Sequence, residues 1–406
     1  MIRVGIIGGA GYTAGELIRI LVNHPEVELV FVHSESNAGN PVSDVHQGLL
    51  GDTDLVFCSE YDLGSIDVLF LCSGHGKSED FWKVHVKPEN LKVIDLAQDF
   101  RDEHDGYVYG LPEWQKDKIA ATDRLANPGC FATCIQLALL PLAAAGLLDG
   151  DINVTAITGS TGAGVKPGAT THFSWRNNNI SAYKVFEHQH LLEINRNLTL
   201  VSVAGGVSED SSLRSVPPQA VPPLTMPRVA RSSDTPPATD SPLCSLHANP
   251  STTSMAQSTY VPPATDSPLC SLHANPSTTS MAQSTYVSPA TGWKLDFVPM
   301  RGDFARGIFA TAIVSCRLSE EEAVKLYKEY YNGAAFTFVC NRPIDLKDAV
   351  NTNKAILHIE KHSDKLAITA VIDNLLKGAS GQAVQNMNIM FGLPEKLGLR
   401  LKASAF

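Results

Sequence analysis

The N-terminal stretch joins two apolar runs through a glycine-rich turn and an amphipathic segment. The run Ile2–Ile7 is typical of a parallel strand buried on both faces, and Val27–His33 predicts a second strand. Between them, the turn Gly8–Gly15 leads into a helix expected at about Glu16–Asn23. A strand, a helix and a second strand in this order form a β-α-β unit. The chain is therefore expected to begin with a doubly wound α/β domain of parallel strands.

The turn itself has the spacing Gly8-x-x-Gly11-x-x-Ala14. Gly8 suits a tight turn, and Gly11 would let backbone N–H groups approach a pyrophosphate at the helix start. This is the context of a dinucleotide fingerprint, although Ala14 replaces the usual third glycine. A turn that merely connects strand and helix is the alternative. The hydroxyls and amide that follow His33 favour NADP weakly over NAD, while Glu35 keeps both open.

Further strands are expected at Asp54–Cys58, Asp67–Cys72 and Lys92–Ala97. The loop Ser73–Gly76 follows one strand and Arg101 follows the next. Both therefore belong at the carboxyl edge of the sheet, where open α/β folds bind ligands. His75 is either a functional group or an ordinary loop histidine, and Arg101 is either an anion contact or a surface arginine.

The turn Asn127–Gly129 delivers Cys130 to the start of an apolar helix that ends near Gly146. Unpaired N–H groups and the positive end of the helix macrodipole both favour a thiolate at such a position. We therefore predict that Cys130 is a nucleophile, against the alternative of a buried small apolar residue. Cys134, one turn further, is expected to be a core residue.

A strand at Asn153–Thr158 and a glycine-rich loop precede a cluster of His188, His190 and Glu193. No further histidine or cysteine stands at the spacing of a zinc site, so no metal is expected. His190 and Glu193 would share one helix face. A carboxylate there could hold an imidazole that acts as acid or base beside a cysteine.

The stretch 200–292 differs in composition from the rest of the chain. Fourteen of the 24 prolines fall between Pro217 and Pro289, and Pro236–Val261 recurs unchanged as Pro262–Val287, a period of 26 residues. Solenoid repeats vary in sequence and have an apolar face for stacking, which this repeat lacks. We therefore predict a disordered Pro/Ser/Thr-rich insertion that interrupts the second domain.

Order is expected again after the insertion. Strands are predicted at Leu295–Val298, Gly307–Leu318, Phe336–Cys340, Lys354–Lys361 and Lys365–Ile372, the last two as a hairpin. A capping box at Ser319 begins one helix, and a final helix runs to about Phe391. These elements predict a mixed, largely antiparallel sheet with helices on one face.

With 406 residues the chain can form two domains with separate cores. We expect a Rossmann-type domain at 1–150, a catalytic domain at 151–373, and a helix at about 374–392 that packs back onto the first domain. The net charge of −10 argues against nucleic acid or an anionic membrane as a partner. Eight cysteines without a CxxC pair indicate neither a disulfide framework nor a zinc site. Because the chain opens on a strand and lacks an apolar run of about 18 residues, we expect a cytoplasmic protein.

The residues alone thus predict a dinucleotide-type domain, a cysteine at a helix start and a histidine–glutamate cluster. An enzyme that pairs a thiolate with a nicotinamide carries out aldehyde–acyl chemistry. The thiolate attacks a carbonyl, and hydride passes between the thio-adduct and the cofactor.

Six segments occur along the chain in the order GGAGYTAGEL, NPGCFAT, GSTGAG, EHQHLLEI, RGDFARGIFAT and DNLLKGASGQAVQNMN. Over about 1–199 and 293–406 they resemble the N-acetyl-gamma-glutamyl-phosphate reductases of arginine biosynthesis. Aspartate-semialdehyde dehydrogenases are similar only in general plan. The resemblance implies an oxidoreductase that uses NADPH to reduce an N-acylglutamyl 5-phosphate to the semialdehyde, with release of phosphate. It also implies a homodimer or homotetramer formed through the second-domain sheet.

By position, the resemblance makes Cys130 the thiolate that forms the acyl-enzyme and His190 the acid/base, with His188 as the alternative. Glu193 would orient the imidazole or contact substrate. Three further residues would bind substrate: Arg101, Asn127 and Arg306. The expected NADP(H) contacts are Gly8, Gly9, Ala10, Gly11, Tyr12, Thr13, Ser34, Ser36, Asn37, Ser73, Gly74, His75, Ser160, Gly162 and Asn374.

Two alternatives remain. One is the same chemistry on an N-succinylglutamyl, aminoadipyl or aspartyl phosphate. The other is a non-catalytic NADP-binding protein, which the insertion makes conceivable.

Overall fold

The structure, a computed structural model, describes residues 1–205 and 292–403. These residues belong to one compact unit. The predicted insertion lies outside the described residues from 206 to 291. The sequence predicts that the insertion begins at residue 200, but residues 200–205 still belong to a helix. In the described ranges, no helix is both long and apolar enough to cross a bilayer.

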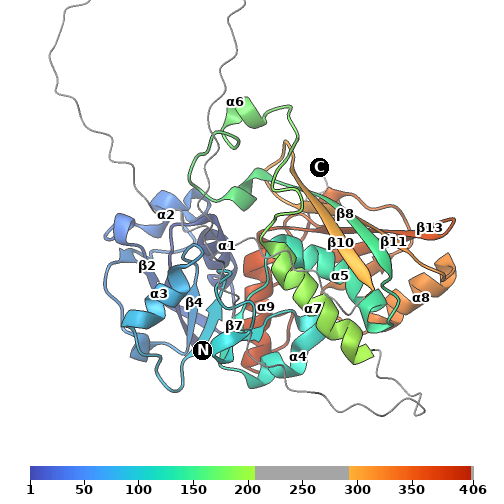
Figure 1. Cartoon of the computed structure of the whole chain (residues 1–406). Coiled ribbons are helices and arrows are strands. Elements are labelled where there is room, and N and C mark those ends of the chain that lie inside the picture. The colour runs from blue at the N-terminus through green and yellow to red at the C-terminus, as the bar shows by residue number, and fades with distance from the viewer. Residues whose placement is uncertain (206–291, 404–406) are drawn as a thin grey trace, which may run out of the picture. The chain divides into compact units, whose positions relative to one another are not determined.

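The first sheet contains seven parallel strands in the order β3-β2-β1-β4-β5-β7-β6. It lies in the blue to cyan part of Figure 1, where β2, β4 and β7 are labelled. The strands are β1 (Ile2–Ile7), β2 (Val27–His33), β3 (Phe57–Cys58), β4 (Val68–Leu71), β5 (Lys92–Asp95), β6 (Val108–Tyr109) and β7 (Arg124–Ala126). The chain winds outward from β1 in one direction and then from β4 in the other. This confirms the doubly wound fold, with its crevice at the carboxyl ends of β1 and β4.

Four helices accompany the strands of the first sheet. They are α1 (Tyr12–Leu21), α2 (Val42–Val45), α3 (Lys77–Val84) and α4 (Pro112–Ala121). α1 begins four residues earlier than predicted, because the turn closes within Gly8–Gly11 and the next residues already adopt helical geometry. Leu17, Ile18 and Leu21 lie on its buried face, and this burial fixes the helix on the sheet.

The second sheet has the strand order β12-β13-β14-β11-β8-β10-β9. Its strands are β8 (Gly150–Thr158), β9 (Ser181–Ala182), β10 (Trp293–Arg301), β11 (Ile308–Ser315), β12 (Thr337–Cys340), β13 (Ala355–His362) and β14 (Lys365–Ile372). The pairs β8–β10 and β12–β13 are parallel and the other pairs are antiparallel, which confirms the predicted mixed sheet. β10 follows the undescribed segment and pairs with the whole length of β8.

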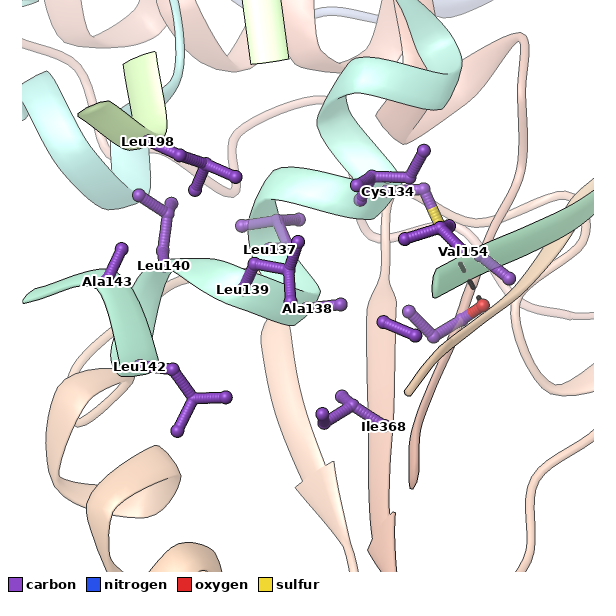
Figure 2. Close-up of a cluster of buried hydrophobic side chains, with 14 of the residues drawn as sticks. Cys134, Leu137, Ala138, Leu139, Leu140, Leu142, Ala143, Val154, Leu198 and Ile368 are labelled. Atoms are coloured by element: carbon purple, nitrogen blue, oxygen red, sulfur yellow. Dashed lines mark hydrogen bonds between the residues drawn. The ribbon is translucent and has the colours of Figure 1, made fainter. Parts of the chain in front are cut away.

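Three long helices share one apolar cluster with the second sheet: α5 (Cys130–Ala144), α7 (His190–Gly205) and α8 (Glu320–Tyr330). α5 is buried on every side over 13 of its 15 residues, and a helix that is apolar all round needs neighbours all round. Figure 2 shows its side chains beside Val154, Ile368 and Leu198, and Cys134 is a core residue there. From the sequence, the boundary between the two domains is expected at residue 150, after α5. In the structure, α5 instead packs with the second sheet.

Pro141 lies inside α5 and cannot donate to the carbonyl of Leu137, four residues earlier. The hydroxyl of Tyr331, at the end of α8, donates to this carbonyl at 2.5 Å. Tyr327, one turn earlier, donates to the carbonyl of Ala138 at 2.5 Å. The Tyr331 hydroxyl thus satisfies the carbonyl that the proline leaves open, and the Tyr327 hydroxyl binds the carbonyl next to it.

The C-terminal part returns to the first sheet. A π-helix at Leu376–Ser380 leads directly into α9 (Gly381–Met390). Ala383, Val384 and Met387 of α9 lie in one apolar cluster with residues of β1 and α1. A short helix, α6 (Phe173–Arg176), precedes β9.

Candidate active site

The glycine-rich turn makes a corner without side chains at the end of β1. Gly8 has a φ of +81°, and a Cβ added there would lie 2.8 Å from the carbonyl carbon of Cys72 and the amide nitrogen of Ser73. Only glycine fits this corner, because a side chain would be strained and would collide with the neighbouring main chain. The loop Ser73–His75 therefore lies directly beside the turn.

The first turn of α1 opens onto this corner. Its N-cap, Gly11, provides no capping side chain, and the first turn contains no acidic residue. A Cβ at Gly11 would meet no atom closer than 3.8 Å, so the space beside it is open. Helix N-termini of this kind bind phosphate groups through their N–H groups. The predicted contacts Gly8–Thr13 therefore fit a pyrophosphate.

Hydroxyl and amide groups gather at the end of β2. Asn37 Nδ2 donates to Ser34 Oγ at 3.2 Å and to Ser36 Oγ at 3.0 Å. This cluster lies at the carboxyl edge where the ribose of a dinucleotide binds in such sheets. Hydroxyls and amides can donate to a 2′-phosphate, so the residues fit NADP.

The second glycine-rich loop contacts the start of β11. The amide of Ser160 donates to the carbonyl of Phe304 at 2.9 Å. Asn374 accepts from the amide of Gly307 at 2.7 Å and donates to Thr161 Oγ1 at 3.1 Å. The buried Asn374 side chain is thus used within the protein, which differs from the cofactor contact expected of it.

The π-helix Leu376–Ser380 joins the nucleotide turn to the cysteine. Ser380 Oγ donates to the carbonyl of Thr13 at 2.7 Å. A Cβ added at Gly378 would lie 2.8 Å from the Cβ of Cys130. Both contacts arise within one short segment, so Cys130 lies close to the turn that fits a dinucleotide. π-helical turns occur often at functional sites.

Cys130 is the first residue of α5, as predicted, but the resting thiol is not favoured as a thiolate. Burial raises the pKa of the thiol to about 11, although the amide of Phe131 and the charge of Arg101 act to lower it. The expectation that the helix N-terminus would give a thiolate is therefore wrong for the free protein. A proton acceptor must act when the sulfur attacks.

The two histidines lie together near Cys130. The ring of His190 lies against Gly129, where an added Cβ would be 2.5 Å from Nε2, and its ring centroid is 4.6 Å from that of His188. Burial lowers the pKa of His190 well below its usual value, helped by the charge of Arg101. Burial also lowers the pKa of His188 to about 4. Both imidazoles are therefore neutral near pH 7 and can accept a proton.

Glu193 supports the site without hydrogen-bonding to the imidazole. Its Oε1 accepts from Arg101 at 3.0 Å, and its Oε2 accepts from the Tyr109 hydroxyl at 2.9 Å and from the Gly129 amide at 3.2 Å. The distance from Oε1 to His190 Nε2 is 3.9 Å, too long for a hydrogen bond. The carboxylate instead fixes the backbone just before Cys130.

The three residues expected to bind substrate are all engaged inside the protein. Arg101 also donates to the carbonyls of Asn127 and Leu96, and the Asn127 amide donates to the Ala379 carbonyl. Arg306 forms ion pairs with Glu16 and with Asp373. Substrate binding is expected of these three residues from the sequence. In the structure their side-chain polar groups already bind other parts of the protein.

Two residues that sequence reasoning passed over stand beside the histidines. The guanidinium carbon of Arg301 lies 4.5 Å from the ring centroid of Tyr183, which in turn lies 5.8 Å from that of His188. Arg301 belongs to the RGDFARG segment, but its position next to the histidines depends on the pairing of β9 with β10. A further missed residue is Tyr109, whose hydroxyl donates to Glu193. No sequence pattern indicated it, because its strand β6 has only two residues.

The described residues contain no cluster of three or more histidine, cysteine, aspartate or glutamate side chains that could hold a metal ion.

Families of known proteins match both parts of the chain. The family model "Semialdehyde dehydrogenase, NAD binding domain" matches residues 3–122, and "Semialdehyde dehydrogenase, dimerisation domain" matches residues 130–211 and 278–374. An N-acetyl-gamma-glutamyl-phosphate reductase of Bacteroides thetaiotaomicron is 47% identical over 409 residues, covering 100% of both chains. The chain belongs to the N-acetyl-gamma-glutamyl-phosphate reductase family. A reductase of that name from Flavobacterium johnsoniae is 42% identical, again covering 100% of both chains.

Solved structures resemble the chain in fold. Aspartate semialdehyde dehydrogenase from Candida albicans, solved with NADP, has a TM-score of 0.61 at 14% identity and covers 96% of this chain and 99% of its own. Aspartate semialdehyde dehydrogenase II from Vibrio cholerae has a TM-score of 0.60 at 13% identity, covering 97% and 98%. At these identities the likeness shows the shared fold.

Proposed function

We infer that the protein reduces N-acetyl-L-glutamyl 5-phosphate with NADPH, giving N-acetyl-L-glutamate 5-semialdehyde and phosphate. One observation carries this inference. Gly378 and Ser380 connect Cys130 to the nucleotide turn, in a chain 47% identical over its full length to a reductase with this name. A thiol beside a nicotinamide site suits reduction of an acyl group through a thioester.

The predicted cofactor contacts support NADP(H) as the redox partner. The turn Gly8–Thr13 would hold the pyrophosphate at the start of α1, and Ser34, Ser36 and Asn37 would hold the 2′-phosphate. Ser73–His75 would line the same edge. Bound NADPH supplies the hydride that reduces the thioester.

Cys130 and His190 carry out the remaining steps. The Cys130 sulfur attacks the acyl carbon and its proton passes to the neutral imidazole of His190. The C–O bond to phosphate then breaks to leave a thioester, and the departing phosphate takes up a proton from solvent. N–H groups at the start of α5 stabilise the negative oxygen that forms during attack. After reduction, the C–S bond breaks, the semialdehyde leaves, and His190 returns the proton to sulfur. His188 packs against His190 and would assist in its place if His190 proves dispensable.

Glu193 and Arg101 are positioning residues in this scheme. Their ion pair holds the Gly129 amide and the Asn127 carbonyl, so it sets the direction in which α5 presents Cys130. Neither needs to touch the substrate to influence its reaction.

The assembly and location follow from the same assignment. We propose that the second-domain sheet forms a homodimer or homotetramer, since the matching family model is a dimerisation domain. We also propose a cytoplasmic location, where a catalytic thiol stays reduced. The six cysteines of the described residues are free thiols, which fits such a compartment.

NADPH consumption with four acyl phosphates tests the function. We expect turnover with N-acetylglutamyl phosphate, and parallel assays with N-succinylglutamyl, aminoadipyl and aspartyl phosphates identify the preferred acyl group. No turnover of any N-acylglutamyl phosphate would refute the proposal.

A cysteine variant tests the chemistry. Cys130→Ser should lower kcat by at least about 1000-fold while NADPH still binds, because the hydroxyl is a far weaker nucleophile. Cys340→Ser, at a partly buried thiol on β12, is the matched control and should keep activity. Equal behaviour of Cys130→Ser and the wild type would favour a non-catalytic NADP-binding protein.

A further inference from the structure

Arg301 stands at the end of β10 beside the histidine cluster, where its guanidinium lies over the ring of Tyr183 at 4.5 Å. Its Nε atom is buried and has no hydrogen-bond partner. A buried, unsatisfied guanidinium nitrogen is costly unless a ligand satisfies it. Its backbone carbonyl accepts from Arg176 at 2.6 Å, so the strand end that presents Arg301 is firmly held.

The other arginines near the site already have partners within the protein. Arg101 pairs with Glu193, and Arg306 pairs with Glu16 and Asp373. Arg176 donates to the carbonyls of Thr170 and Asn179 as well as to that of Arg301. Arg301 is therefore the guanidinium beside the histidines that has no carboxylate partner and an unsatisfied Nε donor.

We propose that Arg301 binds the α-carboxylate of the acyl phosphate substrate and thereby selects amino-acid derivatives. This proposal rests on the proposed function, which supplies a substrate with two anionic groups. The phosphate is attached to the reacting carbon and must lie at Cys130. The α-carboxylate lies at the other end of the carbon chain.

A series of ring contacts connects the histidine beside Cys130 with Arg301. The ring centroids of His190 and His188 are 4.6 Å apart, those of His188 and Tyr183 are 5.8 Å apart, and Arg301 caps Tyr183. In the substrate, four carbon–carbon bonds separate the reacting carbon from the carboxylate carbon, a span of about 5 Å when extended. Arg301 is thus separated from His190 by the rings of His188 and Tyr183, on the side of the site away from the acid/base, where the far carboxylate is expected.

The charge of Arg301 also acts on His188. After burial and the charge of Lys184, it contributes to lowering the pKa of His188. Lys184 is itself held by a hydrogen bond from its Nζ to Gln189 Oε1 at 3.0 Å. A carboxylate bound at Arg301 would partly neutralise this cationic surface and hold the substrate chain beside the histidines.

The test compares two substrates in wild type and in Arg301→Gln and Arg301→Lys. The second substrate, 4-acetamidobutyryl phosphate, is N-acetylglutamyl phosphate without its α-carboxylate. With the complete substrate, Arg301→Gln should lower kcat/KM by about 100-fold, mainly by raising KM. Arg301→Lys should lower kcat/KM by a smaller factor. With the truncated substrate, wild type and Arg301→Gln should be equal within about 2-fold.

Lys294→Gln is the matched control, since Lys294 is an exposed cation on the same strand. It should leave kcat/KM unchanged for both substrates. The proposal is overturned if Arg301→Gln has no effect on the complete substrate. It is also overturned if the loss is equal for both substrates, which would indicate a role toward the phosphate or in folding.

Wild-type turnover of the complete substrate reports the proposed function separately. Protection of Cys130 from alkylation by N-acetylglutamate, but not by 4-acetamidobutyrate, gives a binding readout that needs no turnover. Loss of this protection in Arg301→Gln is expected, and unchanged protection would contradict the assignment.

Discussion

At the scale of single residues, Cys130 is subject to opposing effects. The start of α5 offers an amide hydrogen bond from Phe131 and a positive dipole, and Arg101 adds a charge. Cys130 is only partly exposed, and the loss of water around its sulfur outweighs these contributions. The neutral thiol is then paired with a neutral His190, so catalysis needs proton transfer between them rather than a ready thiolate.

The pH dependence of alkylation tests this balance. Because the thiol pKa is raised to about 11, the thiolate fraction near pH 7 is smaller than for a free cysteine. The rate of Cys130 alkylation by iodoacetamide should therefore rise about tenfold per pH unit and show no plateau below about pH 9.5. Mass spectrometry of the modified peptide measures the rate at this site. A plateau near neutral pH would instead indicate a stabilised thiolate.

At the scale of elements, α5 depends on side chains from another helix. Pro141 leaves the Leu137 carbonyl without its helical donor, and Tyr331 supplies a hydroxyl at 2.5 Å. The two elements come together only in the folded chain, because nearly two hundred residues separate them.

Tyr331→Phe should therefore destabilise the protein by about 1–3 kcal/mol, since a buried carbonyl loses its donor while the ring is kept. Urea unfolding followed by tryptophan fluorescence measures the change. Tyr330→Phe, at the neighbouring position, is the control, and no described hydroxyl bond is removed there. Equal effects of both variants would show that the Leu137 contact has no special importance.

The π-helix Leu376–Ser380 is the second decisive element. Gly378 faces Cys130 so closely that an added Cβ would lie 2.8 Å from the cysteine Cβ, and it also approaches the main chain. The segment must therefore keep a small residue at this point to hold the sulfur near the nucleotide turn.

Gly378→Ala should lower kcat by at least about tenfold, because α5 or the π-helix must shift to make room. It should also cost about 1–3 kcal/mol of stability. Gly48→Ala is the matched control: nothing lies within 4 Å of its added Cβ, and it should leave kcat unchanged. Full activity of Gly378→Ala would refute the proposed close approach at Cys130.

At the scale of the whole molecule, Arg306 ties the two sheets together. It comes just before β11 of the second sheet and pairs with Glu16 of α1 and with Asp373, which precedes the π-helix. Glu16 and Asp373 are both buried, so the guanidinium neutralises two carboxylates that have little water.

Arg306→Met should destabilise the protein by about 3–5 kcal/mol at neutral pH, because two buried carboxylates lose their partner. Burial tends to raise the pKa of Glu16, but Arg19 and Arg306 lower it below 4.5. Its ionisation therefore stabilises the fold above that pH, and this contribution is lost on acidification. The difference between variant and wild type in the free energy of unfolding, measured with urea, should become smaller below about pH 4.5.

Arg3→Met is the matched control, since the Arg3–Asp67 pair is exposed on the first sheet and should contribute little. If Arg306→Met were no more destabilising than Arg3→Met, Arg306 would not be the link between the sheets.

Much of the fold could be predicted because its signals are local. The apolar runs of β1 and β2 and the capping box of α8 fix those elements within a few residues, and the structure has them at the predicted places. The two-residue strand β6 could not be predicted, since it exists only by pairing with β7. The contacts that place α5 with the second sheet depend on surfaces distant in sequence.

The sequence by itself determined the β-α-β start, the glycine turn and the delivery of Cys130 to a helix N-terminus, because turns and periodicity are encoded by neighbouring residues. Only the tertiary structure decided the ionisation of that thiol and the ion-pair partner of each arginine. Burial sets the first, and the second depends on partners such as Glu193, which lies 92 residues from Arg101. Desolvation and charge pairing arise between distant segments, so they exist only once the chain has folded.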